Sequence, residues 1–203
     1  MVVDMNLNPE NWGMSQLQSQ VSLLPHNTFG IDVQARYWIA LSSTKETKEF
    51  LMDNIHNPLP LFILGGGSNI LFTGDFQGVM IKNEIKGKEV IQETEDHVWL
   101  RVGAGENWHE LVLYCLKNEW GGIENLSLIP GNVGAAPIQN IGAYGVEIKD
   151  VFEHLEAINL KTANSKTFSH QECQFGYRDS IFKRLAKGLY MITHVTFKLS
   201  RHS

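Results

Sequence analysis

Cysteine is scarce in this sequence, which has 2 cysteines among 203 residues. Cys115 and Cys173 lie far apart, and neither belongs to a pair with metal-ligand spacing, so we expect both thiols to be reduced. The 8 histidines include no HExxH pattern and no pair at helical spacing. These absences argue against a disulfide framework and predict that the protein has no metal site.

A long apolar segment is also lacking. No run approaches the ~18 to 20 apolar residues of a membrane-spanning helix, and residues 1–20 lack the basic start and apolar middle of a signal peptide. A net charge of -5 argues against general affinity for nucleic acid or an anionic membrane surface. We therefore expect a cytoplasmic protein without nucleic-acid or membrane partners.

The pattern of apolar residues predicts an α+β fold. Hydrophobic residues make up 43% of the chain, which is enough for a sizeable core in one domain or two small ones. Helices are expected at residues 45–56 and 106–119, the second with a core-facing stripe of Trp108, Leu111, Val112 and Cys115. Strands are expected at residues 61–64, 78–82, 89–92, 98–102, 151–160 and 189–199.

The most informative segment is the central loop, residues 129–145, with the sequence IPGNVGAAPIQNIGAYG. It holds four glycines among small and amide-bearing residues and carries no charge. Glycine lets the main chain approach a ligand closely, and free N–H groups can then hold phosphate oxygens. The alternative interpretation is an irregular, turn-rich loop without a ligand.

A second glycine-rich segment, the glycine turn at residues 64–69 (LGGGSN), follows an apolar strand. Its amides could cradle a pyrophosphate, with Ser68 and Asn69 adding side-chain donors. No Lys-Ser/Thr pair follows, which excludes a nucleotide triphosphate loop, and Ile70 stands where the Rossmann pattern needs its third glycine. Gly105 belongs to a similar run that fails the Rossmann test at Trp108.

The arginine segment, residues 175–183 (FGYRDSIFK), places Arg178 between the aromatic ring of Tyr177 and the carboxylate of Asp179. This arrangement can direct a guanidinium at an anionic ligand. The alternative is a surface ion pair between Arg178 and Asp179.

Five segments in this order resemble the UDP-N-acetylenolpyruvoylglucosamine reductase (MurB) family, the flavoenzymes of bacterial peptidoglycan synthesis. They are residues 27–32 (NTFGID), the glycine turn, residues 103–108 (GAGENW), residues 124–126 with the central loop, and the arginine segment. The resemblance covers all but about the first twenty residues. It implies an FAD-binding fold of the vanillyl-alcohol oxidase and p-cresol methylhydroxylase type.

The resemblance also implies a division of the chain. Residues 1–20 would form a polar extension, residues 21–77 a first FAD-binding subdomain and residues 78–203 a second, truncated one. The substrate-binding third domain of the family would be absent, so we expect the N-terminal part of such an enzyme. Truncation would expose strand edges, and the strand at residues 189–199 is the expected edge.

By the same resemblance, non-covalent FAD is held by both glycine-rich segments, and Tyr144, Tyr177 and Arg178 contact the substrate, with Arg178 as the catalytic residue. Gln139 and Asn140 would bond the flavin ring or the sugar nucleotide, or else cap their own loop. The implied cofactor-binding residues are Gly65, Gly66, Gly67, Ser68, Asn69, Ile129, Pro130, Gly131, Gly134, Ala135, Ala136, Gln139, Asn140, Gly142 and Ala143.

The implied reaction uses NADPH as hydride donor and reduces UDP-N-acetylglucosamine enolpyruvate to UDP-N-acetylmuramate in a protein that is a monomer when complete. The family's serine proton donor and glutamate belong to segments downstream of the arginine, and no such segment follows Arg178 here. Ser180 matches a structural position instead. The alternatives are an FAD or UDP-sugar binding module without turnover and, disfavoured by the arginine segment, a flavin oxidase of the same fold.

Overall fold

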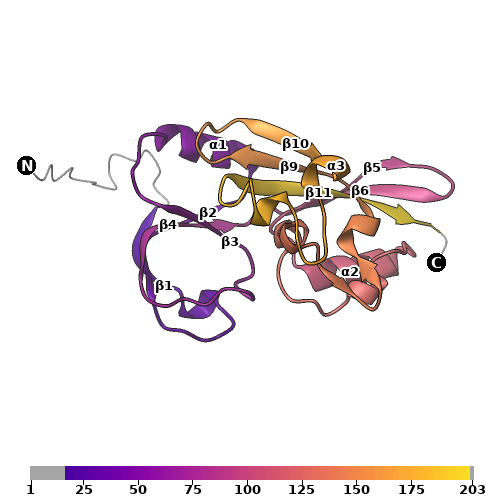
Figure 1. Ribbon diagram of the computed structural model, residues 1–203, viewed down its shortest axis with the longest axis horizontal. Coiled ribbons are helices and arrows are strands. Elements are labelled where there is room, and N and C mark those ends of the chain that lie inside the picture. The colour runs from indigo at the N-terminus through magenta and orange to yellow at the C-terminus, as the bar shows by residue number, and fades with distance from the viewer. Residues whose placement is uncertain (1–16, 202–203) are drawn as a thin grey trace, which may run out of the picture.

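A computed structural model describes residues 17–201, which form two sheets that share a core (Figure 1). The N-terminal sheet lies in the left lobe of the view, and the larger C-terminal sheet runs along the top towards the right. The mixture of strands and helices confirms the predicted α+β class. No described helix has the length and apolar character needed to span a membrane.

The first sheet has the order β1-β2-β4-β3, with β1 at Gln18–Ser22, β2 at Gln34–Leu41, β3 at Leu61–Leu64 and β4 at Phe76–Asn83. β2, β4 and β3 are parallel, and β1 is antiparallel to β2. Helix α1, Thr44–Asp53, connects β2 to β3 and begins where Ser43 accepts a hydrogen bond from the Glu46 N–H. It buries Phe50 and Leu51.

The second sheet is antiparallel and has the order β10-β9-β11-β6-β5. Its strands are β5 (Lys88–Glu93), β6 (His97–Gly103), β9 (Phe152–Asn159), β10 (Ser165–Ser169) and β11 (Tyr190–Ser200). β11 lies between β9 and β6, so the prediction that residues 189–199 form an exposed edge is wrong. The edges of the sheet are β10 and β5.

One face of this sheet is covered by α2, Trp108–Lys117, which Asn107 caps by accepting a hydrogen bond from the Glu110 N–H. The stripe of four residues predicted for this helix is buried. Trp108 packs edge-on against Phe197 of β11 and donates its indole N–H to the Leu126 carbonyl at 2.8 Å. This helix therefore fixes both the sheet and the chain that leads into the central loop.

The two sheets meet at a hydrophobic cluster in which Ile158 and Met191 of the second sheet pack against α1 and the first sheet. Asn83, at the end of β4, is buried and donates its side-chain amide to the Ile192 carbonyl at 2.8 Å. Strand β4 belongs to the first sheet and continues to residue 83, whereas the sequence predicts the boundary between the two subdomains at residue 78. The division into subdomains stays a prediction.

Short elements complete the fold. They are α3 (His170–Cys173), β7 (Gly142–Ala143), β8 (Val146–Glu147) and 3-10 turns at Leu24–His26, Glu124–Leu126, Val133–Ala135, Pro137–Gln139, Ile148–Asp150 and Ile181–Lys183. Cys115 and Cys173 are free and buried, and burial raises the pKa of each thiol to about 12. Most of the predicted N-terminal extension, residues 1–16, lies outside the described residues, and the rest enters β1.

Candidate functional site

The glycine turn begins where β3 ends at Leu64. Residues 27–32, the first segment that resembles the reductase family, contact this turn. Thr28 donates its N–H to the Gly67 carbonyl at 3.1 Å. Gly67 has φ +69°, and a Cβ at this residue would lie 2.0 Å from the His26 carbonyl oxygen. Only glycine fits this combination of positive φ and backbone contact.

The central loop lies along residues 103–108 through backbone hydrogen bonds. Trp108 donates to Gly131 at 3.0 Å, Val133 to Glu106 at 2.9 Å, and Gly134 to Ala104 at 2.9 Å. The GAGENW segment thus has a structural role in supporting the loop, because its backbone is the surface on which residues 131–134 are laid.

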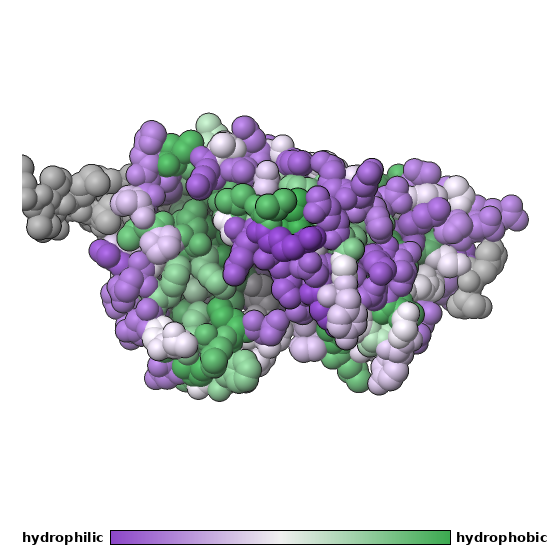
Figure 2. Space-filling view, viewed as in Figure 1, coloured by the Kyte–Doolittle hydropathy of each residue, from purple (hydrophilic) through white to green (hydrophobic). Residues whose placement is uncertain are grey.

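The glycine turn and the central loop face each other across a cleft. A Cβ on Gly66 would lie 3.0 Å from the Gly131 Cα and 2.9 Å from the Asn132 Oδ1, so the two backbones approach more closely than side chains would permit. Asn69 donates its amide to the Gln139 Oε1 at 3.3 Å and joins the two segments directly. Figure 2 shows the molecule hollowed between its two lower lobes.

The cleft has a volume of about 740 Å³, within the range of small-molecule and cofactor sites. Backbone and apolar side chains form most of its wall. Its lining comprises Phe62, Ile63, Leu64, Gly65, Gly66, Gly67, Ser68, Asn69, Ile70, Trp108, Ile129, Pro130, Gly131, Asn132, Ala135, Ala136, Ile138, Gln139, Ile141, Phe182, Lys183 and Lys187.

Eleven of the predicted cofactor residues line this cleft: Gly65, Gly66, Gly67, Ser68, Asn69, Ile129, Pro130, Gly131, Ala135, Ala136 and Gln139. The other four, Gly134, Asn140, Gly142 and Ala143, do not. Gly134 packs against Ala104, where a Cβ would lie 2.6 Å from the alanine Cβ. Gly142 and Ala143 form β7 and line a different cavity.

Asn140 holds the loop in place. It is fully buried at φ +44°, donates its side-chain amide to the Gly176 carbonyl at 2.9 Å and accepts a hydrogen bond from the Lys149 N–H at 3.2 Å. Both ends of its amide are therefore engaged within the protein. This geometry gives Asn140 a structural role that connects the central loop to the arginine segment and to residue 149, which lies after the loop.

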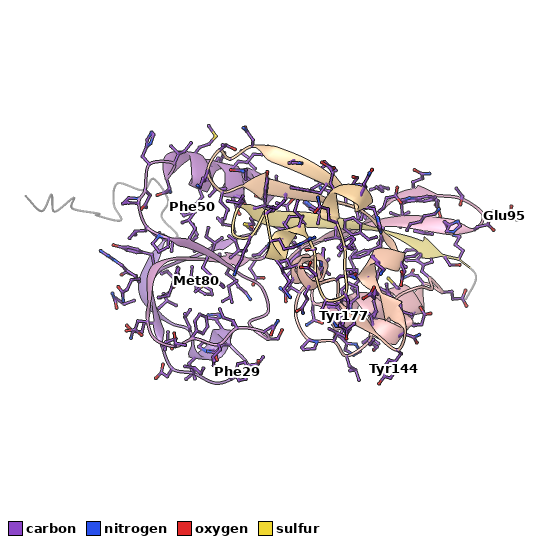
Figure 3. All side chains as sticks on the ribbon, viewed as in Figure 1. Phe29, Phe50, Met80, Glu95, Tyr144 and Tyr177 are labelled. Carbon is purple, nitrogen blue, oxygen red and sulfur yellow. The ribbon has the colours of Figure 1, made fainter. Side chains whose placement is uncertain are left out.

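Tyr144, Tyr177 and Arg178 meet in a second cavity of about 540 Å³, the tyrosine cavity. The two tyrosine side chains are 90% and 85% exposed, so packing does not explain them. Figure 3 shows both on the right lobe, across the hollow from Phe29. The structure therefore brings the three predicted substrate residues together.

The Arg178 guanidinium donates to the Gly142 and Asn140 carbonyls and lies over the Tyr177 ring with its Cζ 5.8 Å from the centroid. Asp179 pairs with Arg184 at 3.0 Å, not with Arg178. The ion-pair alternative for Arg178 is therefore wrong. Its guanidinium faces two carbonyl oxygens in a cavity that Glu147 and Asp150 also line. Lys149 lowers the pKa of Glu147, and the Arg178 charge lowers it further to a smaller extent.

Ser180 connects the arginine segment to the cleft. Its side chain is buried, donates to the Ile138 carbonyl at 2.7 Å and accepts from the Phe182 N–H at 3.2 Å. A hydroxyl engaged in this way is a structural link and is closed to solvent, which agrees with the position inferred from sequence.

Several residues at the cleft were not predicted. Asn132 lies within the central loop and donates to the Gly105 carbonyl at 3.0 Å, so its small amide side chain was a usable signal. Lys183 and Lys187 bring positive charge to the lining but follow the arginine segment without a motif of their own. Lys82 holds the Gly65 carbonyl from strand β4, where nothing in the sequence marks it.

A family model described as an FAD binding domain matches residues 35–169. The chain is also similar to curated proteins named UDP-N-acetylenolpyruvoylglucosamine reductase. It is 50% identical over 188 residues to that of Flavobacterium johnsoniae and 52% identical over 185 residues to that of Amoebophilus asiaticus. These matches cover 93% and 91% of this chain and 55% of each relative, so the chain spans about half their length.

Solved structures have the same fold. The crystal structure of the reductase MurB from Thermus caldophilus matches 93% of this chain and 64% of its own, with a TM-score of 0.74 and 25% identity. A p-cresol methylhydroxylase structure, at 12% identity, matches 82% of this chain and 36% of its own with a TM-score of 0.60, which shows the fold alone. The chain belongs to the FAD binding domain family.

Proposed function

We propose that this chain binds FAD without a covalent link in the cleft between the glycine turn and the central loop. We further propose that it serves the NADPH-dependent reduction of UDP-N-acetylglucosamine enolpyruvate to UDP-N-acetylmuramate in peptidoglycan synthesis. The observation that carries the proposal is the meeting of two distant glycine-rich backbones in one cleft, in a chain about 50% identical to reductases of this name. A cytoplasmic monomer is part of the proposal.

The residues of the cleft fit FAD. The backbones of Gly66 and Gly131 approach so closely that a Cβ on Gly66 would crowd the Gly131 Cα at 3.0 Å, so the main chain itself forms this part of the wall. Among the described residues, the N–H groups of residues 66–69 donate to no protein acceptor. Free amides in a row suit a pyrophosphate, and Lys183 and Lys187 add charge of the opposite sign at the same wall. The apolar lining suits an aromatic ring system.

When bound, the flavin would accept the hydride of NADPH and pass it to the enolpyruvyl ether. Arg178 would bind the substrate carboxylate, where negative charge increases as the hydride arrives. Its guanidinium is held by the Gly142 and Asn140 carbonyls, so little reorganisation is needed during the reaction. Tyr144 and Tyr177 would form the walls of the substrate pocket from their exposed positions.

A second candidate is FAD or UDP-sugar binding without turnover. It is favoured by the engagement of the Ser180 hydroxyl with the Ile138 carbonyl, which leaves this hydroxyl unavailable as a proton donor. Under this candidate the cleft is complete, but the proton donor of the reaction is not supplied by the described residues.

The visible absorption spectrum of the purified chain tests the proposal. We expect flavin bands that remain with the protein after FAD addition and gel filtration, and that bleach when NADPH is added under anaerobic conditions. Bands that remain without bleaching would favour the binding module. No retained flavin at high FAD concentration would contradict both candidates.

A further inference from the structure

Lys82 lies behind the glycine turn, on the side away from the cleft lining. It is the register partner of Leu64 in the parallel pairing of β3 and β4, so its side chain reaches the first residue after β3. The Lys82 Nζ donates to the Gly65 carbonyl oxygen at 2.5 Å, and the side chain is only 16% exposed. The glycine turn is thus attached to β4 by a largely buried cation.

The position is costly for a lysine. The Lys82 Nζ lies 3.8 Å from the Glu84 Oε1, beyond hydrogen-bonding distance. The Lys86 Nζ lies 3.8 Å from the other carboxylate oxygen of Glu84, so the two lysines share this carboxylate. Burial lowers the pKa of Lys82, as does the charge of Lys86, and the Glu84 charge opposes both. An apolar side chain would avoid the desolvation cost, so the fold alone does not account for a lysine here.

The hydrogen bond of Lys82 determines which way one amide points. The structure has no cis peptide bond among its described residues, so the C=O and N–H of each peptide are antiparallel. With the Gly65 carbonyl turned back to Lys82, the Gly66 N–H points away from β4. The Gly67 carbonyl is turned back in the same way by the Thr28 N–H, which directs the Ser68 N–H away as well.

We propose that Lys82 is a positioning residue for the pyrophosphate of a bound dinucleotide, because it aims the Gly66 amide and places a positive charge behind the turn. The inference rests on the proposed binding of FAD. The ligand class is a nucleoside pyrophosphate, since two amides turned away from the groups that hold the preceding carbonyls, with a cation behind the first of them, complement adjacent phosphate groups. Lys82 acts through the turn and does not line the cleft.

Ligand titrations with matched variants test this role. The variants are Lys82→Met, Lys82→Arg and, as a control with the same chemical change at an 83% exposed site, Lys45→Met. The ligands are FAD, ADP and riboflavin, which lacks phosphate. We expect Lys82→Met to weaken FAD and ADP about tenfold or more and to change riboflavin affinity less than about twofold. Lys82→Arg should recover part of the loss, and Lys45→Met should bind as the unaltered chain.

The outcomes separate this inference from the proposed function. FAD binding by Lys82→Met that equals the unaltered chain would overturn the positioning role alone. So would an equal loss for all three ligands with a lowered melting temperature, because that pattern describes a structural residue. An unaltered chain that binds neither FAD nor ADP would overturn the proposed function and this inference together.

Discussion

The glycine cleft and the tyrosine cavity are built in opposite ways. The cleft is lined mainly by the backbone of two glycine-rich segments and by apolar side chains, with a few polar and charged side chains among them. The tyrosine cavity is lined by side chains on exposed turns, and both Tyr144 and Arg178 have positive φ, +49° and +51°. A site built from main-chain groups cannot be altered without changing the fold, whereas exposed side chains can be substituted without rebuilding it.

The contrast predicts that substitutions in the two regions will have different effects. Changes in the cleft should affect cofactor binding and stability together, because the lining is also the scaffold. Changes in the tyrosine cavity should affect turnover with the cofactor retained. Ser180 is where the two regions join, since it binds Ile138 of the cleft from within the arginine segment.

The largest effect is expected for Gly67→Ala. The new Cβ would lie 2.0 Å from the His26 carbonyl oxygen at a residue with φ +69°. The backbone must shift to relieve this clash, and alanine is strained in the left-handed conformation. We expect FAD binding to weaken about 100-fold, equivalent to about 3 kcal/mol. Fluorescence titration of FAD measures the loss. Gly74→Ala, at a site with open space around the Cβ, is the control.

Arg178→Ala should show the reverse pattern. Where the proposed reduction can be measured, its rate should fall about 100- to 1,000-fold, because the removed charge faces the substrate carboxylate. FAD affinity should stay within about twofold, since Arg178 lines only the tyrosine cavity. Steady-state rates measure the fall in turnover, and FAD titration measures the cofactor affinity. An equal loss of FAD would make Arg178 a structural residue.

Ser180→Ala should destabilise the link between the regions. It leaves the Ile138 carbonyl and the Phe182 N–H without their hydroxyl partner in a buried position. We expect the free energy of unfolding to fall by about 1 to 3 kcal/mol, measured by urea denaturation. The exposed Ser165→Ala serves as the control and should change stability by less than about 0.5 kcal/mol. Equal stabilities would show that the two regions are joined elsewhere.

The smallest effect concerns pH. Burial and the nearby Lys82 charge lower the pKa of His26 from 6.5, and burial lowers that of His194 in the same direction. Below about pH 6.5 the unfolded chain therefore binds more protons than the folded chain, and stability falls as pH decreases. The melting temperature should drop between about pH 7.5 and pH 5.5, and His26→Gln with His194→Gln should reduce that drop. An undiminished drop in the double variant would assign it to other groups.

The elements that the sequence predicted are those with a strong local pattern. The LFIL run is β3 at the predicted residues, and the Trp108 stripe is buried as expected. β1, β2 and β10 were not predicted. β10, SKTFS, buries only Phe168, so its pairing with β9 is what makes it a strand. The edge assigned to residues 189–199 was wrong because a partner on either side of β11 comes from earlier in the chain, which its own sequence cannot show.

The candidate site was likewise predictable only in part. The glycine-rich segments indicated which backbone to expect at a ligand site, and eleven of the predicted cofactor residues line the cleft, although their contact with a cofactor stays a prediction. Both interpretations of Asn140 stayed open in the sequence, because an amide in a glycine-rich loop looks the same whether it faces a ligand or the protein. The structure shows its side chain bonded to Gly176 and Lys149. Lys82 was missed because a lysine in a strand is usually solvent-facing. Its burial depends on the turn that folds over it from β3.

The contact between Asn69 and Gln139 joins residues 70 positions apart. Such a contact forms only after a long loop has closed, so the cleft should be completed late in folding, after β3, β4 and the support beneath the central loop. A cofactor that recognises both sides has nothing to bind in the unfolded chain. Retained flavin colour would therefore report that the glycine turn and the central loop have come together, and bound flavin would lower the fraction of unfolded chain.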